Sequence, residues 1–173
     1  FYSFLIKNTS GFEKDIFSFL QDWYSISDVI CVSSSGSTEQ KKSIFLSKKA
    51  MVASAESTCL YFGIDASDTL HLCLPIKYIA GKMMLVRALV SGARLIIEEP
   101  SSSPLKENQE RITFSAMTPM QISGLLDAGP DRILNVAQLI IGGAQVLPVL
   151  QERLQSINTA CYGTFGMTET ATH

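Results

Sequence analysis

Residues 69–98 read TLHLCLPIKYIAGKMMLVRALVSGARLIIE, a pattern typical of a strand, a helix and a second strand. The apolar run Thr69–Leu74 predicts the first strand, and Ala93–Glu98 predicts the second. Between them, Ile79–Val90 predicts a helix that Gly92 ends. Strands joined through a helix run parallel, because the crossover returns the chain to the same end of the sheet. We therefore expect an α/β fold.

The same alternation continues on both sides of this stretch. Further strands are predicted at Asp28–Ser33, Ser43–Leu46, Ile112–Ala116, Gln138–Ile141 and Asn158–Tyr162, and further helices at Ser47–Phe62, Pro119–Leu126 and Pro148–Leu154. This order predicts a mostly parallel sheet flanked by helices on both faces. Sites in such a sheet form at the carboxyl ends of the strands, where polar, glycine-bearing loops follow Ser33, Ile141 and Tyr162.

The composition favours one globular domain. The chain has 173 residues, 46% of them hydrophobic and 17% charged, which excludes a disordered chain. The net charge of −2 gives no basic excess for a phosphate backbone, so we expect no nucleic-acid partner. The apolar stretch Ile79–Ile97 contains Lys82, Arg87 and Arg94, so we expect no membrane span.

The cysteines and the low share of charged residues give two further expectations. Cys31, Cys59, Cys73 and Cys161 lack the short spacing of a metal site, so we expect free thiols in a reducing cytosol and a cytoplasmic protein. The low share of charged residues predicts that part of the surface of this chain is apolar and that another chain segment covers it. Surface of this kind drives association, so we expect a homo-oligomer.

Residues 33–42, SSSGSTEQKK, are the first candidate site. Small residues let backbone N–H groups approach an anion, hydroxyls add donors, and the final lysine adds charge, which is typical of a phosphate-binding loop. The Walker A pattern is absent. A serine-rich surface loop without a ligand has the same composition, and the segment alone does not separate the two.

Two further candidate segments follow predicted strands. Gly142 and Gly143 leave the backbone open for a flat ligand, or make an ordinary turn into a helix. Residues 162–170, YGTFGMTET, combine glycines and an aromatic ring with a hydroxyl and a carboxylate, which suit a phosphate and Mg²⁺. The alternative is a helix N-terminus capped by Thr168. Residues 74–81 either line a pocket or open the next helix. For His71, in mid-strand, we expect a structural role.

Taken in order, the serine-rich loop, residues 75–81, Gly142-Gly143-Ala144 and Phe165–Glu169 (FGMTE) resemble the adenylate-forming superfamily of acyl-CoA synthetases, peptide-synthetase adenylation domains and luciferases. The resemblance covers residues 28–173, and FGMTE is its most specific part. Within the superfamily, residues 78–84, YIAGKMM, are similar to the ligases that join o-succinylbenzoate to coenzyme A in menaquinone biosynthesis. The resemblance implies part of the large N-terminal domain of an adenylate-forming enzyme.

The resemblance also implies ligands and site residues. The ligands would be ATP, Mg²⁺, coenzyme A and a small carboxylic acid. The expected contacts with the β- and γ-phosphates of ATP are Ser35, Gly36, Ser37 and Thr38, with Lys42 adding charge. Beside the adenine and the acyl group the resemblance places Gly142, Gly143 and Ala144, with Phe165 stacked on the adenine. Thr168 would bind the α-phosphate and Glu169 would hold Mg²⁺. The expected catalytic residues are Lys42, Thr168 and Glu169, and the expected acid-binding residues are Tyr78 and Gly81.

The chain departs from the superfamily pattern at three positions. Glu39 stands where the phosphate loop usually has glycine, and Lys41 stands where it has proline. A carboxylate beside a triphosphate is repulsive and would weaken ATP binding, unless Lys41 and Lys42 offset it. Tyr78 replaces a histidine that many relatives have at the entrance of the acyl pocket, which puts any role of that position in doubt.

The superfamily has further functional parts after FGMTE, namely a ribose-binding aspartate, a hinge and a C-terminal domain with an adenylation lysine. We therefore expect residues 1–173 to be a fragment of the AMP-binding N-terminal domain, without the C-terminal domain and inactive alone. Two alternatives remain open. Glu39 and Lys41 would suit a non-enzymatic nucleotide-binding module. An adenylation domain that loads a carrier protein would need a carboxylate near Tyr78 for an amino group, and the sequence shows none there.

Overall fold

The computed structural model of the chain describes residues 11–33, 43–105 and 110–171. Its centre is a five-stranded sheet in the order β4-β3-β5-β6-β7, in which every pair of neighbours is parallel. The strands are β3 (Thr69–Leu72), β4 (Arg94–Ile97), β5 (Ile112–Met117), β6 (Val136–Ile141) and β7 (Ala160–Gly163). The predicted parallel α/β sheet is confirmed.

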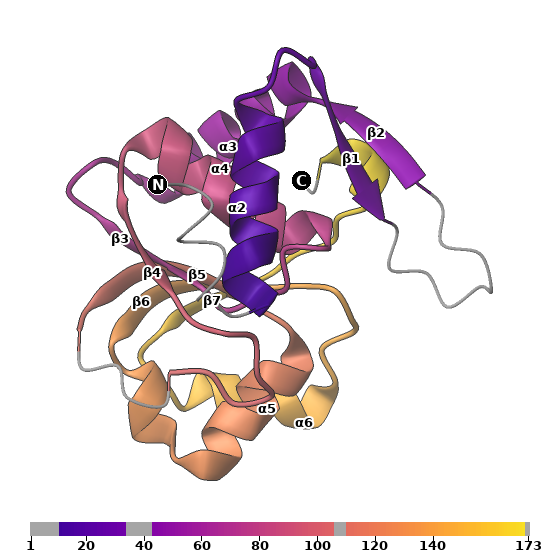
Figure 1. Cartoon of the computed structure of the whole chain (residues 1–173). Helices are drawn as coiled ribbons and strands as arrows, with labels where there is room; N and C mark the ends of the chain where they lie inside the picture. The colour runs from indigo at the N-terminus through magenta and orange to yellow at the C-terminus, as the bar shows by residue number, and fades with distance from the viewer. Residues whose placement is uncertain (1–10, 34–42, 106–109, 172–173) are drawn as a thin grey trace.

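Helices cover both faces of this sheet (Figure 1). One face carries α2 (Gly11–Trp23), α3 (Lys48–Phe62) and α4 (Ile79–Ser91), and the other carries α5 (Pro119–Ala128) and α6 (Pro148–Gln155). Short 3₁₀ turns span Pro130–Ile133 and Thr168–Thr170. Helix α2 was not predicted, and it buries Phe12, Ile16 and Phe19 along one stripe.

Local capping sets where the helices begin and end. The hydroxyl of Ser47 accepts a hydrogen bond from the Ala50 N–H at 3.1 Å and caps the start of α3. Gly63 and Gly92 end α3 and α4 in the left-handed conformation, at φ 67° and 73°. These three residues were predicted to act in this way, because their signals are local in the sequence.

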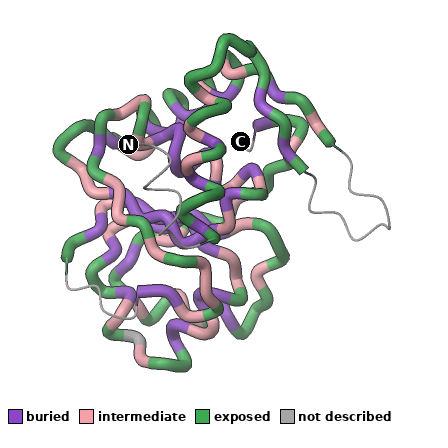
Figure 2. Tube along the Cα trace, viewed as in Figure 1, coloured by how far each residue is buried: buried purple, intermediate pink, exposed green. Residues whose placement is uncertain are grey.

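Two hydrophobic clusters form the core, one on each face of the sheet. Neighbouring residues of a strand point to opposite faces, so Ile140 packs in the cluster under α2, α3 and α4, and Ile141 packs in the cluster over α5 and α6. Figure 2 shows the buried residues running along the strands in the middle of the molecule. The sheet is therefore buried on both faces, as expected of parallel strands.

One prediction of the fold is wrong. Asp28–Ser33 was expected to be a buried strand whose carboxyl end joins the others at the edge of the parallel sheet. Instead β1 (Val29–Ser33) pairs antiparallel with β2 (Ser43–Ser47) in a separate sheet, and only its alternate residues are buried. A parallel crossover takes about a dozen residues or more, and the connection 34–42 is too short for one. The serine-rich segment therefore joins the strands of a hairpin.

All four cysteines are free, as predicted. Burial raises the pKa of the Cys73 thiol to about 12, so it stays protonated and unreactive at neutral pH. In the described part of the chain, no helix has the length and apolar character to cross a membrane.

Candidate functional site

A cavity of about 510 Å³ opens at the carboxyl ends of the parallel strands. Four stretches contribute most of its lining residues: 74–81 after β3, 116–118 at the end of β5, 140–143 at the end of β6, and 164–169 after β7. Arg87 reaches it from α4. The loops that follow Ile141 and Tyr162 thus line a cavity at the edge of the sheet where the sequence predicts a site.

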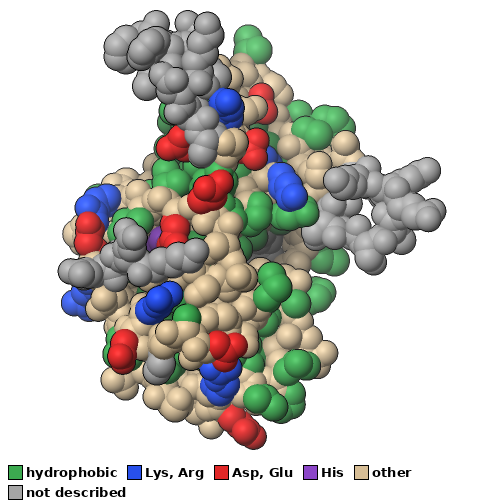
Figure 3. Space-filling model, turned by 60° about the horizontal axis from the view of Figure 1, so that its bottom comes forward, with side chains coloured by type: hydrophobic (Ala, Val, Ile, Leu, Met, Phe, Trp, Pro, Cys, Tyr) green, Lys and Arg blue, Asp and Glu red, His purple; other side chains and the backbone are tan. Residues whose placement is uncertain are grey.

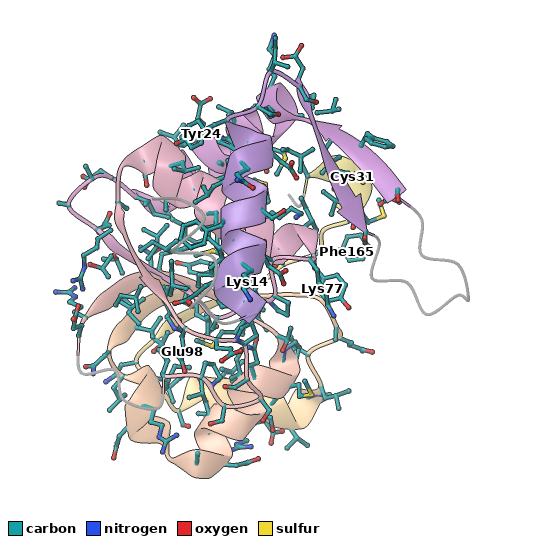
Figure 4. All side chains as sticks on the ribbon, in the orientation of Figure 1. Lys14, Tyr24, Cys31, Lys77, Glu98 and Phe165 are labelled. Atoms are coloured by element: carbon teal, nitrogen blue, oxygen red, sulfur yellow. The ribbon has the colours of Figure 1, made fainter. Side chains whose placement is uncertain are left out.

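The structure brings together most of the predicted site residues that it describes. The residues that line the cavity are Tyr78, Gly81, Gly142, Gly143, Thr168 and Glu169. Ala144 and Phe165 adjoin it in the sequence but do not line it, and the Phe165 ring is exposed (Figure 4). Ser35, Gly36, Ser37, Thr38 and Lys42 lie outside the described residues, so their roles stay predictions.

Backbone hydrogen bonds tie three strand ends together at the cavity. The Gly142 N–H donates to the Met117 carbonyl at 3.2 Å, and the Thr164 N–H donates to the Ile141 carbonyl at 2.8 Å. A Cβ on Gly142 would lie 2.9 Å from the Thr164 hydroxyl, and Gly143 has φ 83°. A side chain at the first position would therefore force the Thr164 hydroxyl to move, and at the second it would strain the backbone, which favours glycine at both.

The start of α4 is packed tightly against the turn that follows β3. A Cβ on Gly81 would lie 2.4 Å from the Pro75 carbonyl oxygen. The Tyr78 N–H donates to the same oxygen at 3.2 Å, and the Lys77 ammonium lies 4.9 Å from the centre of the Tyr78 ring. Gly81 thus acts through its lack of a side chain, which lets the turn approach the helix.

Thr168 and Glu169 stand on the 3₁₀ turn at the rim of the cavity. The turn is held by the Thr170 hydroxyl, which donates to the Met167 carbonyl at 3.0 Å, and by the Ser54 hydroxyl, which donates to the Ala171 carbonyl at 2.9 Å. The Glu169 side chain is exposed. Among the described residues, no group of three or more His, Cys, Asp or Glu side chains could hold a metal ion.

Arg87 is a cavity residue that was not predicted from the sequence, in which it interrupts an apolar stretch. Arg87 is 1% exposed and lines the cavity. Its Nη1 contacts the Met84 sulfur at 3.5 Å, and its guanidinium lies 6.0 Å from the centre of the Phe114 ring. Its Nε and Nη2 have no hydrogen-bond partner among the described residues. The available signal was an arginine on the apolar stripe of a helix.

Burial lowers the pKa of Arg87 to about 10, since desolvation disfavours the cation, and the group is still charged at neutral pH. A buried charge without a partner is strongly destabilising, so the site favours an anion bound against it.

His71, by contrast, is confirmed as structural. Its Nδ1 lies 3.1 Å from the Ser115 hydroxyl and its Nε2 lies 3.0 Å from a Glu98 carboxylate oxygen, inside the sheet and outside the cavity lining.

Comparisons with known proteins agree with this geometry. A family model described as AMP-binding enzyme matches residues 27–173. A 2-succinylbenzoate–CoA ligase of Staphylococcus epidermidis is 28% identical over 139 residues, which is 79% of this chain and 29% of the ligase. A ligase of the same name from Staphylococcus aureus is 25% identical over 181 residues, which is 96% of this chain and 37% of the ligase. The chain therefore spans about a third of these curated relatives.

Solved structures show the same fold. An acyl-CoA synthetase (AMP-forming)/AMP-acid ligase II-like protein from Dyadobacter fermentans superposes with a TM-score of 0.88 at 29% identity, over 95% of this chain and 48% of that chain. An o-succinylbenzoate coenzyme A synthetase from Bacillus subtilis, in complex with ATP and magnesium ion, has a TM-score of 0.73 at 21% identity, over 83% of this chain and 31% of that chain. At this identity, the second likeness shows the fold alone.

Proposed function

The chain belongs to the AMP-binding enzyme family, and we propose that it forms part of the large N-terminal domain of an ATP-dependent acid–CoA ligase that acts on o-succinylbenzoate. Such an enzyme joins the acid to AMP, releases pyrophosphate and then transfers the acyl group to the thiol of coenzyme A. The names of the staphylococcal relatives support the proposal. Because the chain matches only about a third of them, the reaction is proposed for a longer protein that contains it.

The first step makes particular demands on the site. A carboxylate oxygen of the acid bonds to the α-phosphorus of ATP, while the bond to the bridging oxygen breaks and pyrophosphate leaves with its electrons. No base is needed for a carboxylate nucleophile, so the enzyme has to position two anions and neutralise their charge. The Thr168 hydroxyl can donate to a phosphate oxygen, and Gly142 and Gly143 leave open backbone beside it.

Glu169 is the described residue that would hold Mg²⁺. The ion usually takes one or two carboxylates, and waters and substrate phosphates complete its octahedral shell, so a single exposed carboxylate at the cavity rim fits it. Bound there, Mg²⁺ would neutralise the phosphate charge during the transfer.

Arg87 is the observation that carries the choice of acid. o-Succinylbenzoate has two carboxylates, and only one of them is joined to AMP. The second stays anionic inside the cavity and needs a cation that water does not already solvate. Arg87 lines the cavity, its buried Nε and Nη2 have no hydrogen-bond partner among the described residues, and guanidinium matches carboxylate in both charge and shape. A fatty acid has no second carboxylate and would leave Arg87 unpaired.

The carrier-protein alternative finds less support. Recognition of an amino acid's ammonium group would require a carboxylate in the cavity. Glu169 is the one acidic residue among the described lining residues, and its proposed partner is Mg²⁺. The non-enzymatic alternative depends on Glu39 and Lys41, which lie outside the described residues.

The test is ATP–pyrophosphate exchange by the longer protein, with o-succinylbenzoate, benzoate, a long-chain fatty acid and an amino acid as substrates. We expect exchange with o-succinylbenzoate and thioester formation when coenzyme A is added. Arg87→Met should raise the KM for o-succinylbenzoate at least tenfold, since losing one partner of a buried charged pair costs about 2–5 kcal/mol.

Lys82→Met is the matched control, because Lys82 stands on the same helix and lies against the Phe19 ring, away from the cavity lining. Its KM should stay within about twofold of the wild-type value. Exchange with another acid would keep the chemistry and reject the substrate. Exchange with no acid would favour the non-enzymatic module, and an unchanged KM in Arg87→Met would reject Arg87 as the anchor.

A further inference from the structure

Gln121, in the first turn of α5, uses both ends of its side-chain amide although it is only 4% exposed. Its Oε1 accepts hydrogen bonds from the Thr118 N–H at 3.1 Å and from the Thr118 hydroxyl at 3.3 Å. Its Nε2 donates to the Cys73 carbonyl at 2.9 Å and to the Ser101 carbonyl at 3.0 Å. All the hydrogen-bonding capacity of the amide is therefore satisfied.

Capping explains only the oxygen half of this arrangement. Thr118 and Gln121 form a capping box at the start of α5, in which the glutamine oxygen accepts from the N-cap backbone. The nitrogen half reaches two other segments that have no part in the cap. One is the turn after β3, where Cys73 directly precedes the cavity residues Leu74 and Pro75. The other is the connection that follows β4.

That connection is itself firmly held, so it can serve as an anchor. The Ser103 hydroxyl donates to the Gly124 carbonyl at 3.4 Å, and a Cβ on Gly124 would lie 2.3 Å from the Ser102 carbonyl oxygen. Further along, the Leu105 N–H donates at 2.8 Å to the Glu98 carboxylate oxygen that also lies 3.0 Å from His71 Nε2. The connection thus lies against α5 and is pinned to β3.

We propose that Gln121 is a positioning residue of the cavity, which fixes the turn after β3 relative to the end of β5. The two segments carry cavity-lining residues, Leu74 and Pro75 on one and Thr118 on the other, and the amide bonds to both. This end of the amide has to be an N–H donor, because it faces two carbonyl oxygens, those of Cys73 and Ser101. The expected effect of Gln121 on binding of the acid rests on the proposed function, whereas its expected effect on the position of the turn does not.

Gln121→Glu separates the two halves of the amide. A glutamate keeps the acceptor oxygens and caps a helix as well as glutamine does. It replaces the N–H donors with an oxygen that faces the Cys73 and Ser101 carbonyls, and this contact is repulsive. If Gln121 acts only as a cap, Gln121→Glu lowers stability through this repulsion but leaves deuterium uptake at residues 73–81 and the KM as in the wild type. If it positions the turn, the variant loses the contact to β3 while α5 stays capped.

Gln138→Glu is the matched control. The Gln138 amide also donates to a backbone carbonyl, that of Phe62 at 3.1 Å, in a partly buried hydrogen bond, but Gln138 does not line the cavity. Two measurements on the longer protein compare the variants. Hydrogen–deuterium exchange reports the amides of residues 73–81, and ATP–pyrophosphate exchange reports KM and kcat for o-succinylbenzoate.

In Gln121→Glu we expect at least tenfold faster deuterium uptake at residues 73–81 and a KM about tenfold higher with little change in kcat, a factor that corresponds to about 1.4 kcal/mol. Gln138→Glu should leave both within about twofold. Unchanged uptake, or an unchanged KM with an active enzyme, would overturn the proposal. If the wild type exchanges with no acid, the proposed function fails, and the deuterium uptake alone decides whether Gln121 holds the turn.

Discussion

Arg87 and Glu169 show how single residues define the cavity by charge. Arg87 is a buried cation with two unpartnered nitrogens among the described residues, and Glu169 is an exposed anion at the rim. On the proposed function, an anionic acid would lie between the desolvated Arg87 guanidinium and the Glu169 carboxylate, the proposed ligand of Mg²⁺. A contact with buried Arg87 is electrostatically stronger than a contact with exposed Glu169, because less water screens it.

The sequence-predicted catalytic residues can be tested one at a time in the longer protein. Thr168→Ala, Glu169→Gln and Lys42→Ala should each lower the rate of ATP–pyrophosphate exchange, by roughly 10²–10³-fold where a phosphate contact made in the transition state is lost. The melting temperature should stay within a few degrees, because Thr168 and Glu169 stand on a short turn at the cavity rim and not in the core.

Glu152→Gln is the control for the charge change, since Glu152 is an exposed carboxylate on α6 outside the cavity lining. Its exchange rate should match the wild type. Full activity in all three site variants would reject the assignment of the site, and a slowed Glu152→Gln would show that net charge, and not position, controls the rate.

At the scale of the elements, the cavity depends on how closely a turn and a helix approach each other. The turn after β3 and the start of α4 touch at Gly81, while the amide of Gln121 fixes the same turn from the other side. The strand ends of β5, β6 and β7 are tied by backbone hydrogen bonds. The cavity is therefore built from backbone contacts, which side chains of the wrong size would disturb.

Gly81→Ala tests this close approach. The added methyl would lie 2.4 Å from the Pro75 carbonyl oxygen, which is backbone and cannot rotate away. We expect a loss of about 1–3 kcal/mol in the free energy of unfolding, measured by urea denaturation. Gly163→Ala is the control, because its Cβ would meet nothing within 4 Å, and it should lose less than about 0.5 kcal/mol. Equal losses in both variants would contradict the expectation.

At the scale of the whole molecule, the surface carries many exposed apolar side chains. Figure 3 shows hydrophobic side chains gathered along one side of a face, away from most of its charged groups. Among the described residues, the large exposed ones include Ile26, Phe45, Leu60, Tyr61 and Phe165. Exposed apolar area of this kind drives association.

We accordingly expect this chain to form a dimer or a higher oligomer, and light scattering over a concentration series measures it. Sulfate should strengthen the association and sodium chloride should affect it little, because apolar contacts respond to surface exclusion and not to charge screening. A monomer mass at every concentration would contradict the expectation. Dissociation by sodium chloride would show that charge pairs hold the oligomer instead.

Much of the fold was predictable because its signals are local. Ser47, Gly63 and Gly92 set helix ends through neighbours within a few residues, and the apolar runs around Leu70, Phe114 and Ile140 mark buried strands. Strands separated by helices leave a parallel sheet as the main solution. The carboxyl ends of parallel strands meet at one edge of the sheet, and this places Tyr78, Gly142, Thr168 and Glu169 together there.

The tertiary structure alone decided what depends on contacts distant in the sequence. Whether Arg87 faces water or a cavity depends on Phe114 and on the strand ends that enclose it, and a sequence does not show this packing. The amide of Gln121 reaches Cys73 and Ser101, which lie 48 and 20 residues away. The pairing of β1 with β2 depends on which partner is within reach of a short connection. Periodicity and caps thus determine the elements, whereas burial and long-range hydrogen bonds determine what the cavity can bind.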